Sequence, residues 1–128
     1  MARRASKHPT DVELEILHVL WDLGPASLGQ ICDAVNEQRP FAKTTVATVL
    51  SVMLEKKLVK RSRGSRGYLW SARVSRTATT EGLVGRLLDR MFDGSAQRLV
   101  AHLLEEKRLT DREREEIKRL LESAPKKR

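Results

Sequence analysis

The stretch between residues 58 and 71 limits the fold of this 128-residue chain most tightly. Two short β-prone runs, 58–63 and 68–71, flank the Gly-containing turn 64–67. This arrangement is typical of a β-hairpin. Between positions 56 and 66 there are six basic residues and no acidic one: Lys56, Lys57, Lys60, Arg61, Arg63 and Arg66. We therefore expect a single, strongly basic hairpin with helical patterns before and after it.

Three helices are predicted before this hairpin. Thr10 and Ser27 each begin a capping box, in which a hydroxyl N-cap is followed three residues later by Glu or Gln. Leu23-Gly24-Pro25 ends the first helix, because Gly permits a left-handed backbone and Pro cannot continue a helix. Apolar residues recur at helical spacing within each segment. The expected helices span about residues 11–22, 28–37 and 42–56.

The third predicted helix has two unlike faces. One face is apolar and consists of Val46, Val49, Leu50 and Met53. The other is small, hydroxylated and almost uncharged, whereas an ordinary solvated helix face would carry Glu and Lys. The residues of this second face are Lys43, Thr44, Thr45, Ala47, Thr48 and Ser51.

Three helices followed by a basic hairpin, all within residues 9–74, give the element order of a winged helix-turn-helix domain. We therefore predict a mostly α-helical fold with a small β-hairpin wing. In such a domain the third helix enters the major groove of DNA, where small hydroxyl side chains permit close approach to base edges and phosphates. Basic side chains of the hairpin neutralise phosphates. The predicted DNA contacts of the wing and its flanks are Lys60, Arg61, Arg63 and Arg66.

The second half of the chain contains no strand pattern and predicts three more helices, at about residues 76–92, 96–106 and 111–122. Their apolar stripes exceed what so small a winged domain can cover. We expect two chains to pack these stripes together in a homodimer with region 75–122 as its interface, which would present two half-sites to DNA. The alternative is that these helices fold back and close the core of a monomer. The residues predicted to form the dimer contact are Leu83, Leu87, Leu88, Met91, Leu99, Val100, Leu103, Leu104, Ile117 and Leu120.

The sequence offers little support for catalysis or metal binding. The three His residues are scattered, there is one Cys, and no Gly-rich phosphate loop is present. We therefore expect no enzyme activity, no catalytic residue, no cofactor, no metal site and no small-molecule substrate. The lone Cys32 and the absence of an apolar run near the ~20 residues of a membrane span favour a cytoplasmic protein. The basic ends, 1–8 and 123–128, are expected to be disordered.

Other basic binding modules remain as alternatives. A net charge of +8 suits a polyanionic partner, which includes RNA and anionic membranes as well as DNA. RNA readers usually stack bases on exposed aromatic side chains. Tyr68 and Trp70 would serve that purpose if exposed, although packing of the hairpin on the core is favoured. A protein-docking winged helix would show an apolar or acidic exposed face on the third helix, and this sequence does not.

The chain resembles the BlaI/MecI penicillinase-repressor family over about residues 9–122. A hydroxyl-rich helix followed directly by a basic wing, and a Phe-Asp-Gly-Ser turn followed by Leu-Val, are the most specific features. The matching stretches are Leu14-Glu15-Ile16-Leu17, Leu20-Trp21, Gly24, Thr44-Thr45-Val46-Ala47-Thr48-Val49-Leu50, Lys56-Lys57-Leu58-Val59, Gly64 to Tyr68, Phe92-Asp93-Gly94-Ser95 and Leu99-Val100.

The resemblance implies a homodimer that binds a palindromic DNA operator and represses nearby genes, typically genes of β-lactam resistance. It also implies induction by a membrane sensor-protease that cleaves the dimerisation region, and His102-Leu103 is nearest to the cleaved position. The chain departs from the family at Ala47 and Val52, where basic residues are common. Lys57 stands where the helix-ending turn usually has Gly, which predicts a less sharp turn. The Cys-x-Cys pair of copper-responsive relatives is missing.

Overall fold

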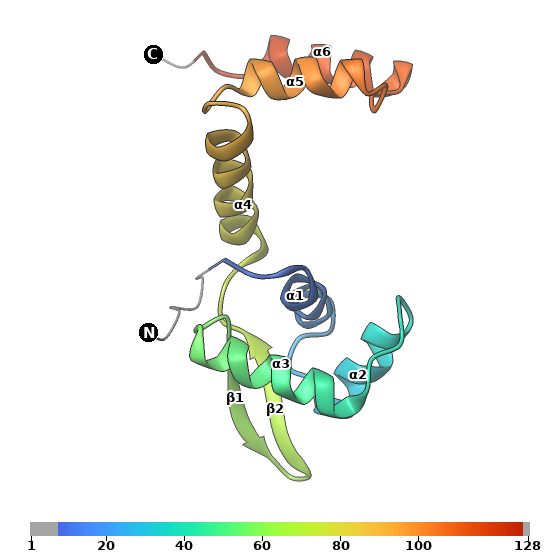
Figure 1. Ribbon diagram of the computed structural model, residues 1–128, viewed down its shortest axis with the longest axis vertical. Helices are drawn as coiled ribbons and strands as arrows, with labels where there is room; N and C mark the ends of the chain where they lie inside the picture. Colours follow the sequence, from blue (N-terminus) through green and yellow to red (C-terminus); the bar gives the residue numbers. More distant parts are fainter. Residues whose placement is uncertain (1–7, 127–128) are drawn as a thin grey trace. The chain divides into compact units, whose positions relative to one another are not determined.

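The computed structural model describes residues 8–126 (Figure 1). Residues 1–7 and 127–128, which include most of the predicted basic arm and the end of the predicted tail, lie outside the described residues. The chain divides into two compact units, and the boundary in the sequence falls between Leu83 and Val84, within helix α4. The first unit contains the predicted winged domain.

The first unit has the predicted order of elements. Three helices are followed by an antiparallel two-stranded sheet and the start of α4, which confirms a mostly helical winged helix-turn-helix fold with one hairpin. Each boundary lies within one residue of its expected position. The elements are α1 (Asp11–Leu23), α2 (Leu28–Asn36), α3 (Lys43–Glu55), β1 (Val59–Gly64), β2 (Gly67–Ala72) and α4 (Arg76–Met91).

Helices α1 and α2 begin at the predicted capping boxes. The Thr10 hydroxyl accepts a hydrogen bond from the Glu13 amide at 3.2 Å, and the Glu13 carboxylate accepts one from the Thr10 amide at 2.9 Å. Ser27 and Gln30 form the same reciprocal pair. Each N-cap contributes about 1 kcal/mol, because it satisfies amides that lack a partner within the helix.

The core of the first unit lies where the three helices meet the base of the hairpin. The apolar face of α3 packs inward, and Val46, Leu50 and Met53 are buried. Cys32 is also buried, and burial raises the pKa of its thiol, as suits a core residue rather than a reactive one. The complete buried apolar set is Ile16, Leu17, Leu20, Ala26, Ile31, Cys32, Val35, Val46, Leu50, Met53, Leu58, Val59 and Trp70.

The hairpin is anchored at its base and extends away from the three helices (Figure 1). Ala26, between α1 and α2, exchanges two backbone hydrogen bonds with Trp70, at 2.9 and 2.8 Å. The Trp21 indole donates to the Val74 carbonyl at 2.9 Å and so holds α1 against the chain that leaves the hairpin. At the turn, Gly64 pairs with Gly67, whose φ of +120° would strain any other residue.

The turn after α3 is sharp, and the expectation of a less sharp turn at Lys57 is wrong. Lys57 adopts φ = 64°, the left-handed conformation that Gly usually provides. Its amide donates to the Leu54 carbonyl at 3.1 Å, and the Leu58 amide donates to the Met53 carbonyl at 2.9 Å. These two bonds form a Schellman motif, and the burial of both Met53 and Leu58 favours it enough to hold a Lys in this conformation.

The second unit contains the end of α4 together with α5 (Ala96–Glu105) and α6 (Asp111–Ser123). Ser95 caps α5, and the predicted capping box of Thr110 and Glu113 begins α6. No side chain between residues 84 and 126 is fully buried. Across residues 8–126, no helix combines the length and the apolar character that a membrane span requires.

Candidate nucleic-acid interface

The residues predicted to read DNA lie together on one face of α3. Lys43, Thr44, Thr45, Thr48 and Ser51 are exposed, and Ala47 is half-buried among them. The opposite face is held in the core. The folded first unit therefore presents a helix surface of small side chains, which a nucleic acid backbone or base edge can approach closely.

Two hydroxyls on this face have defined hydrogen bonds. Thr48 Oγ1 donates to the Thr44 carbonyl at 2.9 Å, and Ser51 Oγ donates to the Ala47 carbonyl at 3.2 Å. Each bond uses the hydroxyl proton within the helix and leaves the oxygen as an acceptor. The amino groups of cytosine and adenine are the donors that such an acceptor meets in the major groove.

Val52 belongs to the same face but was not among the predicted contacts. It lies one turn beyond Thr48 and is 40% exposed, unlike the buried apolar residues on the other side of α3. Val52 follows Thr48 by four residues, and this spacing in the sequence predicts that the two side chains share one face of the helix. An exposed valine on this face suits contact with the methyl group of thymine.

The basic residues of the hairpin divide between its two faces, because successive side chains of a strand point to opposite sides. Arg61 and Arg63 pair across the sheet with Trp70 and Tyr68. Lys60, which pairs with Ser71, points to the other side. Arg66 lies in the turn. All four predicted wing residues (Lys60, Arg61, Arg63 and Arg66) are exposed, but they do not share one surface.

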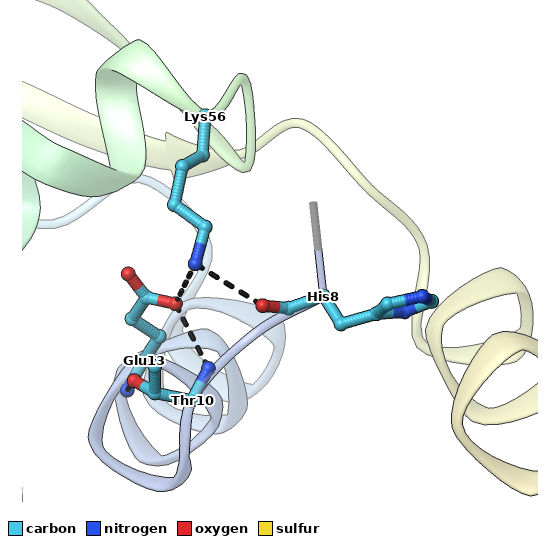
Figure 2. A network of polar contacts seen from close by, with 4 residues as sticks. All are labelled: His8, Thr10, Glu13 and Lys56. Carbon is cyan, nitrogen blue, oxygen red and sulfur yellow. Dashed lines mark hydrogen bonds and ion pairs between the residues drawn. The ribbon is translucent and has the colours of Figure 1, made fainter. Parts of the chain in front are cut away.

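Lys56 does not belong to the exposed basic surface, although it begins the basic run in the sequence. Its ammonium lies 2.6 Å from the Glu13 carboxylate and donates to the His8 carbonyl at 3.1 Å (Figure 2). The side chains of Lys56 and Glu13 are only 6% and 4% exposed. The same carboxylate oxygen accepts the capping hydrogen bond of Thr10. Lys56 therefore ties the end of α3 to the start of α1.

The residues predicted for dimerisation are accessible within the second unit and the adjoining part of α4. None of the ten is buried. Leu87, Met91, Val100, Leu104 and Leu120 are exposed, and Leu83, Leu88, Leu99, Leu103 and Ile117 are half-buried. Val84 and Leu121 are also exposed large apolar residues, although they were not among the residues predicted for dimerisation.

The proposed cleavage position lies inside α5. His102 is exposed and Leu103 is half-buried, and both have helical backbone. The His102 ring also packs edge-on against Phe92, with ring centroids 5.7 Å apart. A protease needs extended backbone, so α5 would have to open before this bond is accessible. Among residues 8–126, His, Cys, Asp and Glu side chains form no group of three suited to a metal ion.

Comparison with known proteins places these features in a family. The family model described as "Penicillinase repressor" matches residues 9–123. The transcriptional regulator BlaI of Mycobacterium tuberculosis is 31% identical over 97 residues, which cover 74% of this chain and 70% of that protein. The penicillinase repressor of Staphylococcus aureus is 19% identical and covers 90% of this chain and 91% of its own length. A solved structure of a cysteine-to-serine mutant of Lactococcus lactis ZitR is 20% identical, covers 93% of this chain and 77% of that chain, and has a TM-score of 0.41.

The two curated relatives are named as a regulator and a repressor, not as enzymes. The family match covers the hydroxyl-rich α3, the basic hairpin and the three C-terminal helices. It confirms the resemblance seen in the sequence. The chain therefore belongs to the penicillinase repressor family.

Proposed function

We propose that the chain is a sequence-specific transcriptional repressor that binds a palindromic DNA operator as a homodimer and is not an enzyme. The observation that carries this proposal is the exposed face of α3, which presents small hydroxyl side chains directly before a basic hairpin. Residues 9–74 would form the DNA-binding domain and residues 75–122 the dimerisation region. A repressor of this kind would act in the cytoplasm, where its operator would lie.

In this proposal, α3 enters the major groove and the hairpin contacts the flanking backbone. Thr48 and Ser51 would accept hydrogen bonds from base amino groups, and Val52 would contact a thymine methyl group. Lys60, Arg61, Arg63 and Arg66 would neutralise phosphates, which releases bound counterions and makes affinity fall as salt rises.

The regulated genes are proposed from the names of the relatives, and the route of induction from the family resemblance seen in the sequence. Other members of the family carry the name "Methicillin resistance regulatory protein MecI". By analogy, the genes repressed here would include β-lactam resistance genes, and a membrane sensor-protease would end repression at His102-Leu103. Local opening of α5 would be required first, because His102 and Leu103 both lie within this helix.

An RNA-binding function has less support from the hairpin. Trp70 is only 6% exposed, and the guanidinium of Arg61 lies over the ring of Tyr68 at 4.2 Å. Trp70 is therefore closed to a stacked base, and Arg61 covers one face of the half-exposed Tyr68 ring. A protein-docking function would need an apolar or acidic face on α3, and its exposed face is neither.

Thr48→Ala and Arg63→Ala are expected to affect DNA binding in different ways. Thr48→Ala should reduce the preference for a selected operator over a shuffled duplex by roughly tenfold, because it removes a base contact. Arg63→Ala should weaken binding to both duplexes equally and lower the salt slope by about one for each protomer, because it removes a phosphate contact. Affinities are measured by fluorescence anisotropy at several salt concentrations, with duplexes enriched from a random pool. Equal losses on both duplexes for both variants would exclude α3 as the reader.

A further inference from the structure

One basic side chain of the hairpin is held by aromatic rings. The guanidinium carbon of Arg61 lies 4.2 Å from the ring centroid of Tyr68 and 5.5 Å from that of Trp70. The two rings pack edge to face, with centroids 6.3 Å apart. Lys60 extends from the opposite side of β1, where neither ring lies. Arg61 therefore has a support that Lys60 lacks.

The two rings differ in exposure. Trp70 is 6% exposed and is anchored by its backbone bonds to Ala26, whereas Tyr68 is 45% exposed and lies nearer the turn. Tyr68 thus packs edge to face against the core-anchored Trp70 and provides the ring nearest to the Arg61 guanidinium. In the described first unit, no acidic side chain competes for this guanidinium in an ion pair.

A supported guanidinium has an advantage in phosphate binding. Guanidinium groups pack on aromatic faces while keeping N–H donors in the fork arrangement that suits a phosphate. A long, unsupported side chain loses its rotamer freedom when it binds, and this loss weakens affinity by roughly twofold to tenfold for each side chain. A side chain already held on a ring avoids most of that loss.

We propose that Tyr68 is a positioning residue, which holds Arg61 ready for a bidentate contact with a DNA backbone phosphate. The proposal rests on the DNA-binding function proposed above and deepens it, because it assigns one particular wing contact to Arg61. Tyr68 itself contributes through its ring, not through its hydroxyl. The contact is independent of base sequence, because backbone phosphates carry no sequence information.

The test is a salt titration of binding to a random-sequence duplex. Tyr68→Leu removes the ring but leaves the charge of Arg61, so affinity should fall roughly twofold to tenfold for each protomer while the salt slope stays unchanged. Arg61→Ala should lower the slope by about one for each protomer. Tyr68→Phe keeps the ring and should bind like the unmodified protein. The thermal unfolding midpoint of each variant is compared with that of the unmodified protein, to check that the hairpin is still folded.

The double variants separate positioning from a general effect on the wing. Tyr68→Leu should cause no further loss in the Arg61→Ala background, because the side chain that it positions is gone. In the Lys60→Ala background it should keep its full effect, because Lys60 lies on the other face of the hairpin.

Three results would overturn the role of Tyr68: an equal effect of Tyr68→Leu with and without Arg61, a loss for Tyr68→Phe as large as that for Tyr68→Leu, or no effect of Arg61→Ala. Each of them requires that the unmodified protein binds the duplex. Failure of the unmodified protein to bind any duplex, or a flat salt response, would instead contradict the proposed function.

Discussion

Replacing Lys56 with Met is expected to lower the free energy of unfolding of the first unit by about 3–5 kcal/mol, because it leaves the buried carboxylate of Glu13 without its partner. The ammonium of Lys56 contacts both that carboxylate and the His8 carbonyl, and the side chains of Lys56 and Glu13 are almost fully enclosed. A loss of this size is a large part of the total stability of about 5–15 kcal/mol that is usual for a small domain.

Urea unfolding followed by tryptophan fluorescence measures this loss. Both tryptophans of the chain, Trp21 and Trp70, lie in the first unit, so the signal reports that unit alone. Lys60→Met is the matched control, since it removes an exposed lysine and should change stability by less than about 0.5 kcal/mol.

A second variant distinguishes the ion pair from simple loss of packing. Glu13→Gln together with Lys56→Met removes both charges and keeps an oxygen that accepts the capping hydrogen bond from Thr10. This double variant should recover most of the stability, because a neutral pair costs far less to bury than a single charge. A Lys56→Met protein as stable as the Lys60→Met control would show that the pair contributes nothing to the fold.

Placing charge on the apolar surface of the second unit is expected to abolish the proposed dimer. Leu87 and Leu104 are 43% and 46% exposed in a single chain, so each would contribute roughly 0.7–1.4 kcal/mol, about half the value for a fully exposed leucine, if a second copy buried it fully. Leu87→Glu combined with Leu104→Glu would instead bring charges into that contact. Sedimentation should then give a mass near 14.5 kDa, whereas the unmodified protein is expected to give twice that value.

Loss of the dimer should also weaken operator binding strongly. Binding through two linked half-site contacts raises the overall affinity roughly 10²- to 10⁴-fold above that of one contact. The monomeric variant should therefore lose affinity on that scale for a duplex with two half-sites. Gln97→Glu, which adds a charge at an exposed polar position of α5, is the control and should remain a dimer. An unmodified protein that sediments as a monomer would remove the proposed role of the second unit.

The helices and the hairpin were predictable because their signals are local. Capping boxes at Thr10, Ser27 and Thr110 mark the helix starts, and their hydrogen bonds form within four residues of sequence. Apolar spacing then indicates which face of α3 is buried, and Val46, Leu50 and Met53 are buried as that spacing predicts. These features depend on neighbours in the chain, and local sequence is enough to specify them.

One feature that was missed depends on residues far apart in the sequence. Lys56 was counted in the basic run of residues 56–66, yet its partner Glu13 lies 43 positions away and is brought near only by packing of α1 against α3. The turn at Lys57 is set by burial of Met53 and Leu58, which outweighs the preference for Gly. Lys60 and Arg61 lie on opposite faces of the hairpin because successive side chains of a strand alternate between its faces. This feature could have been predicted from the sequence. The roles of the α3 and hairpin residues in DNA binding remain predictions.

The most direct test of the central claim compares the affinity of the unmodified protein for a duplex enriched from a random pool with its affinity for a shuffled duplex of the same composition. If the hydroxyl-rich face of α3 reads bases, the enriched duplex should bind roughly 10³-fold or more tightly at physiological salt. Equal affinity for the two duplexes, or tighter binding to single-stranded RNA, would contradict the assignment of this chain as a sequence-specific DNA-binding repressor.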